Sequence, residues 1–307
     1  MWSTTHDGAP APMLLKESVT IEQESLAGLG LKYNPCVVRF EGEMWMAYRA
    51  RLSPAAHRHE SCIGLARLSP QYQVLESRLL TIPAAAGAVS QEDPRLFVAM
   101  DTLWLSFAEP SEAWRRCRVV VGRLIPRRFR WVAEVPLTYA RSTPREKNWL
   151  LYDDGDGMKC LYRPSPHTLL DASERNMRLV LERPGPTWAF GEWRNSAGPV
   201  LRGDEWYVIT HSYEGTFQQW SGRRYHVGAY TYDAKPPYRI KRFTPAPISS
   251  AADLAGPFQD HPRVLLPMGL VWADDRWIVS CGVNDAECRI LHLDADQLER
   301  NLVPWSE

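Results

Sequence analysis

The sequence lacks several features, and each absence excludes a class of protein. No run of about 18 apolar residues occurs in the 307 positions, so a membrane-spanning helix is not expected. The first twenty residues lack a basic segment followed by an apolar stretch and a cleavage site, so no signal peptide is expected. Net charge is zero, because 36 Lys and Arg balance 36 Asp and Glu. With no overall field to attract nucleic acid or a membrane surface, we expect neither as a partner.

Paired cysteine motifs are also missing. Six cysteines stand at positions 36, 62, 117, 160, 281 and 288, and none forms a Cys-x-x-Cys pair. They lie in apolar stretches, which favours buried thiols in a reducing cytoplasm over disulfides or a metal site. We therefore predict a cytoplasmic protein without a metal.

Helical periodicity is scarce, and short β-rich runs separated by Gly, Pro and Asp dominate the sequence. One pattern recurs five times: a polar or Pro-containing segment, a short apolar strand, a turn, and an aromatic strand. The copies cover residues 34–49, 92–107, 146–163, 196–211 and 267–282. Their second strands begin near positions 44, 103, 158, 205 and 276, a spacing that suits a four-stranded unit with its connections.

Five such units in a ring predict an all-β protein, a five-bladed β-propeller with four-stranded blades. The alternative is a pair of β-sandwich domains, which the five-fold spacing disfavours. We predict one propeller domain over residues 31–307, and an N-terminal arm or a closing strand over residues 1–30.

In a propeller the first strand of each blade lines the central channel. Many cations and few acids lie at the starts of the first strands and at the ends of the second strands, which meet at one mouth of the channel. These cations are Arg49, Arg95, Arg145, Lys147, Arg163, Arg194 and His211. Clustered like charges are unfavourable without an anion, and arginine is well suited to phosphate. The pattern therefore predicts an anion site that contains one or two carboxylates.

These side chains also have a purely structural interpretation. Arg95 would form an ion pair with Glu92 or Asp93, and Lys147 would form one with Glu146. His211 would then be a core histidine, and Asp93 and Asp285 would close turns.

Eight short motifs occur in order over about residues 30–295: Tyr33-Asn34-Pro35, Ala47-Tyr48-Arg49-Ala50, Glu92-Asp93-Pro94-Arg95, Glu146-Lys147-Asn148-Trp149, Tyr162-Arg163-Pro164, Ser196-Ala197-Gly198-Pro199, Thr210-His211 and Gly282-Val283-Asn284-Asp285. Together they resemble glycoside hydrolase family 130, the five-bladed β-1,2-mannoside phosphorylases and hydrolases, and the related β-1,2-mannosyltransferases.

The resemblance implies an inverting reaction with one protein carboxylic acid, Asp93, acting through a sugar hydroxyl. It implies phosphate or anion ligands among Arg49, Arg145, Lys147, Arg194 and His211. Sugar-binding residues would be Asn34, Arg95, Asn148, Arg163 and Asp285. No metal or cofactor is implied, and inorganic phosphate would be a co-substrate.

Some positions depart from the family pattern. Trp149-Leu150-Leu151-Tyr152 stands where phosphorylases commonly have Leu-Phe-Pro, and Tyr162 replaces the His of His-Arg-Pro. Two other forms, Glu146-Lys147-Asn148-Trp149 and Ser165-Pro166-His167, are closer to the transferase relatives. The donor therefore stays open between mannose 1-phosphate, a nucleotide sugar and an oligosaccharide.

The leading hypothesis is a β-1,2-mannoside phosphorylase or mannosyltransferase that acts on a mannose-containing oligosaccharide or on mannose 1-phosphate. A β-mannoside hydrolase, a non-catalytic carbohydrate-binding propeller and a protein-interaction scaffold are the alternatives. Homo-oligomers formed through the terminal arms are compatible with the resemblance.

Overall fold

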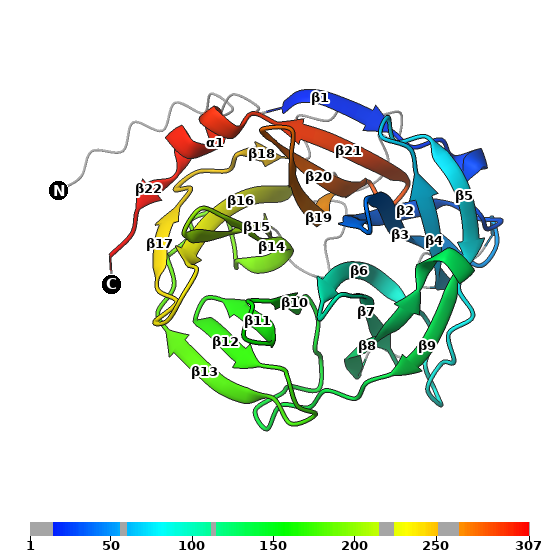
Figure 1. Cartoon of the computed structure of the whole chain (residues 1–307), viewed down its shortest axis with the longest axis horizontal. Coiled ribbons are helices and arrows are strands. Elements are labelled where there is room, and N and C mark those ends of the chain that lie inside the picture. The colour runs from blue at the N-terminus through cyan, green and yellow to red at the C-terminus, as the bar shows by residue number, and fades with distance from the viewer. Residues whose placement is uncertain (1–14, 56–59, 112–114, 215–223, 251–263, 307) are drawn as a thin grey trace.

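Five antiparallel β-sheets follow one another around a central axis, as Figure 1 shows. The computed structural model describes residues 15–55, 60–111, 115–214, 224–250 and 264–306. The predicted all-β, five-bladed propeller is confirmed.

The blades follow the chain in order. Blade 1 contains β2 (Lys32–Phe40), β3 (Glu43–Arg51), β4 (Ser61–Leu68) and β5 (Val74–Leu79). Blade 2 contains β6 (Glu92–Ala99), β7 (Thr102–Pro110), β8 (Cys117–Ile125) and β9 (Arg130–Glu134). Blade 3 contains β10 (Leu150–Asp153), β11 (Met158–Pro164), β12 (His167–Asp171) and β13 (Arg178–Arg183).

The last two blades carry additions. Blade 4 contains β14 (Arg194–Arg202), β15 (Glu205–Glu214), β16 (Arg224–Asp233) and β17 (Ile240–Phe243), extended by the short strands β18 (Ser249–Ser250) and β22 (Val303–Pro304). Blade 5 contains β19 (Leu265–Ala273), β20 (Arg276–Val283) and β21 (Glu287–Leu293).

The fourth strand of blade 5 comes from the other end of the chain. β1 (Leu15–Thr20) pairs antiparallel with β21, with Val19 opposite Ile290. The N-terminal strand therefore completes the blade that the C-terminal strands begin. Residues 1–14 of the predicted arm lie outside the described residues.

Tight turns connect the first two strands of several blades. Glu41–Gly42, Met100–Asp101 and Asp274–Asp275 are two-residue turns in which both residues have positive φ. This geometry matches the right-handed twist of the flanking strands, and Gly and Asp adopt it at low cost.

The hydrophobic core lies between neighbouring blades. Trp45 of blade 1 belongs to the same buried cluster as Leu103 of blade 2. Met46, the next residue, packs in the cluster that includes Ile278 of blade 5. Successive side chains of a strand point to opposite faces of the sheet, so β3 contributes to both interfaces of its blade.

The helix α1 (Ala295–Asn301) attaches the C-terminal segment to blade 4. The Glu299 carboxylate accepts hydrogen bonds from Arg202, Tyr207 and Arg242 at 2.6–2.7 Å.

No helix in the described part of the chain is long and apolar enough to cross a membrane. The chain also forms short 3-10 turns at Gln23–Ser25 and Pro126–Arg128.

The inner strand of blade 3 follows the predicted pattern. It begins at Leu150, after the polar segment that the pattern placed at residues 146–148. Residues 146–149 form a loop, because the Glu146 side chain binds donors around it and Asn148 has a φ of 61°.

Candidate active site

The innermost strands are irregular near their N-terminal ends, and this irregularity shapes the candidate site. Pairing with the neighbouring strand shifts by one residue after Tyr33 in β2, after Glu92 in β6 and after Asn195 in β14. β19 shifts in the same way after Pro267. Such bulges are frequent next to active sites because they redirect a side chain.

Two of these bulges bring Asn34 and Asp93 together. Each precedes a proline and has a left-handed backbone, with φ of 51° and 52°, a conformation in which Asn and Asp are enriched. The Asn34 amide Nδ2 donates a hydrogen bond to Asp93 Oδ1 at 2.9 Å. Blades 1 and 2 therefore meet through a polar contact at the carboxylate of Asp93.

Two cations face the same carboxylate. Arg49 Nη1 lies 3.5 Å from Asp93 Oδ1, and Lys147 Nζ lies 3.9 Å from Asp93 Oδ2. Both cations are closer to Glu92: Arg49 Nη2 is 2.6 Å from Oε1 and Lys147 Nζ is 3.0 Å from Oε2. Glu92 is thus their main counterion, and Asp93, with 16% of its side chain exposed, stays accessible.

The charged state of these cations follows from their surroundings. Burial by itself lowers the pKa of Arg49 and of Lys147, but the negative charges of Glu92 and Asp93 outweigh it and raise both pKa values. Arg49 Nε also donates to Ser61 Oγ at 2.7 Å, which orients the guanidinium. The two side chains therefore present fixed positive charges to Asp93.

Arg95 is a third buried cation, and its hydrogen-bond acceptors are neutral. It donates to Asn148 Oδ1 at 3.2 Å and to the Met268 carbonyl at 3.5 Å. Burial lowers the pKa of Arg95, whereas Cys36 and Asp93 act in the opposite direction. A guanidinium stays protonated in proteins, so this charge calls for an anion or a strong acceptor.

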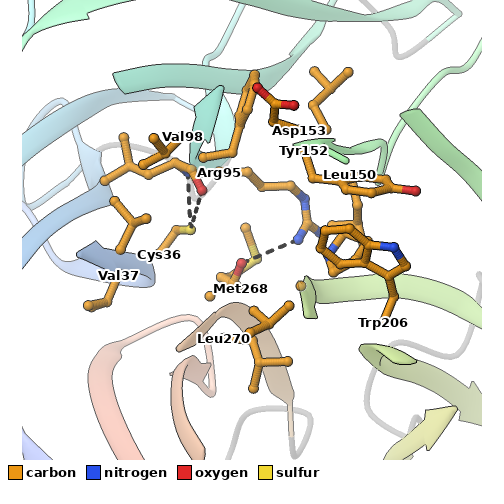
Figure 2. A pocket seen from close by; sticks show the side chains of 18 of the residues that line it. Cys36, Val37, Arg95, Val98, Leu150, Tyr152, Asp153, Trp206, Met268 and Leu270 are labelled. Atoms are coloured by element: carbon orange, nitrogen blue, oxygen red, sulfur yellow. Dashed lines mark hydrogen bonds between the residues drawn. The ribbon is translucent and has the colours of Figure 1, made fainter. Parts of the chain in front are cut away.

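The Arg95 side chain also borders the axial cavity. This cavity has a volume of about 230 Å³. Figure 2 shows Arg95 among its lining residues, with Met268 beside the guanidinium. All five innermost strands line this cavity, mostly with apolar side chains such as Val37, Leu150 and Leu270. The predicted central channel is therefore narrow and apolar below Arg95, and the polar groups gather above it.

His211 lies on the blade 4 side of Arg95. Ser196 Oγ donates to the Pro267 carbonyl at 2.6 Å, so His211 Nδ1 donates its proton to Ser196 Oγ at 3.1 Å. Burial, with the charges of Arg194 and Arg95, lowers the pKa of His211 well below its usual value. The ring is neutral in this state, and its Nε2 is an acceptor that suits a hydroxyl better than an ionised oxygen.

Arg194 lies opposite His211 in the β14–β15 pairing. Its guanidinium lies 4.4 Å from the centre of the Tyr213 ring, and it forms an ion pair with Glu192 at 2.7 Å. The ring of Tyr225 stacks on the ring of His211, with the two ring centres 6.0 Å apart. These residues form a rim of rings and charges beside the buried polar groups.

Asp285 approaches the centre from blade 5. It follows β20 in a turn, is half-buried, and has a φ of 51°. Burial raises the pKa of Tyr33 to about 12. The charge of Arg49 acts against this rise, and the charge of Asp285 adds to it. The Asp285 carboxylate thus lies near the ring of Tyr33 and the guanidinium of Arg49.

Two predicted anion or sugar ligands lie apart from this centre. Arg145 is exposed and Arg163 is exposed, with the Arg163 guanidinium 5.1 Å from the centre of the Tyr162 ring. In the described residues neither forms an ion pair with Asp93 or Glu92. Alternation along β11 explains Arg163, because Tyr162 points inward to Glu146 and its neighbour must point outward.

Glu146 has a role that the sequence did not indicate. Its buried carboxylate accepts hydrogen bonds from the Thr143 amide, from Trp149 Nε1 at 2.9 Å and from Tyr162 Oη at 2.7 Å. The carboxylate thereby fixes the loop that carries Lys147 and Asn148. No local signal predicts this, because Tyr162 comes from β11, 16 residues further along the chain.

Glu92 was the second omission. The sequence suggested Arg95 as its structural partner, whereas the structure pairs Glu92 with Arg49 and Lys147.

Among the described residues, no group of three His, Cys, Asp or Glu is arranged to hold a metal ion.

Gly282 of β20 makes room for Asn34. A Cβ atom at position 282 would lie 1.8 Å from Asn34 Oδ1. We expect Gly282→Ala to lower the free energy of unfolding by about 1–3 kcal/mol, the usual cost of overpacking. Urea denaturation of the variant measures this directly.

The double variant Gly282→Ala/Asn34→Ala provides the control, since it removes the amide that the new methyl group would meet. The two effects should be less than additive. Full additivity, or a Gly282→Ala variant as stable as the parent protein, would contradict the close approach of these two residues.

Comparison with known proteins finds likeness in structure. No protein-family model matches the sequence, and no curated protein does. A β-1,2-mannobiose phosphorylase from Listeria innocua, solved with β-1,2-mannobiose, is 16% identical with a TM-score of 0.64, over 92% of this chain and 94% of that one.

Two further solved structures are similar. MPT-4, a mannose phosphorylase from Leishmania mexicana solved with phosphate, is 13% identical with a TM-score of 0.63, over 95% of this chain and 92% of the other. A structure from a study of glycoside hydrolases in family 130 that target β-1,2-mannosidic linkages in Candida mannan is 11% identical with a TM-score of 0.63, over 91% of each chain. At these identities the likeness establishes the fold, and at that level it confirms the resemblance to glycoside hydrolase family 130.

Proposed function

We propose that the protein catalyses inverting glycosyl transfer on β-mannosides, as a β-1,2-mannoside phosphorylase or mannosyltransferase that uses inorganic phosphate or mannose 1-phosphate. The observation that carries this proposal is the accessible carboxylate of Asp93, which lies in contact with Asn34, Arg49 and Lys147. The names of two structural neighbours, a mannobiose phosphorylase and a mannose phosphorylase, support the substrate class.

In this reaction Asp93 is the general acid. It supplies a proton, through a hydroxyl of the bound sugar, to the glycosidic oxygen as the bond between that oxygen and C1 breaks. A phosphate oxygen forms a bond to C1 from the opposite face. A β-mannoside therefore yields α-mannose 1-phosphate and a free acceptor sugar, and the reverse reaction forms the β-linkage.

The cations would hold the phosphate and stabilise charge in the transition state. Arg95 is the strongest candidate, because its hydrogen bonds in the described residues go only to the neutral oxygens of Asn148 and Met268. Lys147, with 31% of its side chain exposed, can reach the same anion. The neutral His211 would accept a hydrogen bond from a sugar hydroxyl.

Hydrolysis is the second candidate, and Asp285 is the observation that favours it. An inverting hydrolase needs a second carboxylate to activate water. Glu92 is unsuited to this task because it is buried and holds two cations. Asp285, half-buried beside Arg49, is a further carboxylate near the centre.

Incubation with β-1,2-mannobiose, with and without inorganic phosphate, tests the proposal. We expect mannose 1-phosphate and mannose in equal amounts, formed only when phosphate is present. Release of free mannose at the same rate without phosphate would instead assign hydrolysis. Sugar binding by calorimetry with no turnover of any donor would show a carbohydrate-binding propeller and overturn both candidates.

A further inference from the structure

A second cavity, of about 580 Å³, opens beside the candidate site and lies between blade 2 and the segment that leads into blade 3. Its walls come from residues 85–88, from the ends of β7 and β8, and from residues 137–149. Figure 1 shows blades 2 and 3 as neighbours in the ring. The volume falls within the range of small-molecule sites, about 300–1,000 Å³.

This cavity adjoins the catalytic centre. A small pocket lined by Asp93, Arg95 and Asn148 shares two of its lining residues, Val119 and Trp149, with the large cavity. Cys117, in the wall of the large cavity, has its pKa raised to about 12 by burial, and the charges of Lys147, Glu92 and Asp93 act on it. The cavity is therefore adjacent to the charged groups around Asp93.

One loop serves both spaces. Thr143, Glu146 and Trp149 line the cavity, while Lys147 and Asn148 of the same loop contact Asp93 and Arg95. The hydrogen bonds that Glu146 accepts from Thr143, Trp149 and Tyr162 hold this wall in place. The cavity is thus preformed, as ligand sites usually are.

The lining suits an uncharged ligand. Its acids are Glu109 and Glu146, and its arginines are Arg116 and Arg118, so the charges balance. Arg118 pairs with Glu109 at 2.7 Å, and Glu146 is satisfied by neutral donors. In the part of the chain that the structure describes, the buried cation Arg95 donates only to neutral oxygens. An anion would therefore prefer the centre around Arg95, and a neutral, hydroxyl-rich molecule would prefer the cavity.

We propose that this cavity binds the sugar units of an uncharged oligosaccharide beyond the bond that is cleaved, and so makes the protein select longer chains. The inference rests on the proposed function, because it takes Asp93 as the point of cleavage. A disaccharide would occupy only the centre, whereas a trisaccharide or tetrasaccharide would extend past Trp149 into the cavity.

The test uses Ala86→Trp, since Ala86 is exposed and lines the cavity, so that an indole there fills space without disturbing the core. Ala84→Trp is the matched control, because Ala84 is exposed in the same segment and is absent from the lining. Ala85→Trp is an independent second variant at an exposed lining position. Thermal denaturation confirms that each variant is folded.

The measurement is kcat/KM for phosphorolysis of β-1,2-linked mannobiose, mannotriose and mannotetraose. For the parent protein and Ala84→Trp we expect kcat/KM to rise about tenfold from the disaccharide to the longer chains, which corresponds to about 1.4 kcal/mol. Ala86→Trp and Ala85→Trp should abolish this rise and leave the disaccharide value within about twofold.

Equal kcat/KM for all chain lengths in the parent protein would overturn the inference, as would a rise that survives in both cavity variants. Absence of turnover of any mannoside would refute the proposed function instead. In that event, calorimetric titration with mannotetraose decides the inference separately. Binding that both cavity variants weaken at least tenfold would support it, and binding that they leave unchanged, or no binding, would overturn it.

Discussion

Replacement of Asp93 by Asn is expected to lower kcat for β-1,2-mannobiose phosphorolysis by about 10²–10⁴-fold, the usual contribution of a general acid. An amide of the same size cannot supply the proton to the departing oxygen. Asn also tolerates the left-handed backbone at this position, where φ is 52°, so the fold should be preserved. Steady-state kinetics at saturating phosphate measure the effect.

Asp101→Asn is the matched control for this prediction. Asp101 also has a left-handed backbone, with a φ of 51°, but it is exposed in the turn between β6 and β7. This variant should keep parental kcat. Near-parental turnover by Asp93→Asn would discard Asp93 as the acid, and an equal loss in both variants would point to a general effect on folding.

Replacement of Glu92 by Gln is expected to lower the free energy of unfolding by about 3–5 kcal/mol, because it removes the common counterion of two cations. Arg49 and Glu92 have only 7% and 2% of their side chains exposed, so water cannot replace the lost charge. Asp93 would remain near Arg49 and Lys147, but at the longer distances of 3.5 and 3.9 Å. Urea denaturation at neutral pH measures the loss.

The exposed pair of Glu76 and Arg78 provides the comparison. Its atoms are also close, 2.7 Å apart, but 37% and 63% of the two side chains are exposed. Glu76→Gln should therefore change the free energy of unfolding by less than about 1 kcal/mol. Similar small losses in both variants would show that Glu92 is not an essential counterion.

Much of the fold could be predicted because it is repeated. Turns such as Glu41–Gly42 and Asp274–Asp275 stand at the predicted positions, between strands that the alternation of apolar residues had indicated. The pattern did not indicate how residues 146–149 are held, since Glu146 binds Trp149 and Tyr162. Local periodicity cannot show that an aromatic residue donates a hydrogen bond to a buried carboxylate.

The site was less predictable. Asn34, Arg49, Asp93 and Lys147 were expected near one another, and the structure places them in contact. Which acid neutralises which cation could not be predicted from adjacency in the sequence. Glu92 pairs with Arg49 of blade 1 and with Lys147 of the loop before blade 3, and not with its near neighbour Arg95.

By itself the sequence determined the all-β class, the number of blades and the end of the channel that gathers the polar side chains, because each depends on patterns within about twenty residues. Only the tertiary structure decided that Glu92 shields two cations, that Arg95 donates to neutral oxygens, that Arg145 and Arg163 face outward, and that His211 is neutral. These properties depend on bulges and burial, which arise when five blades close around one axis and bring distant residues within hydrogen-bonding distance.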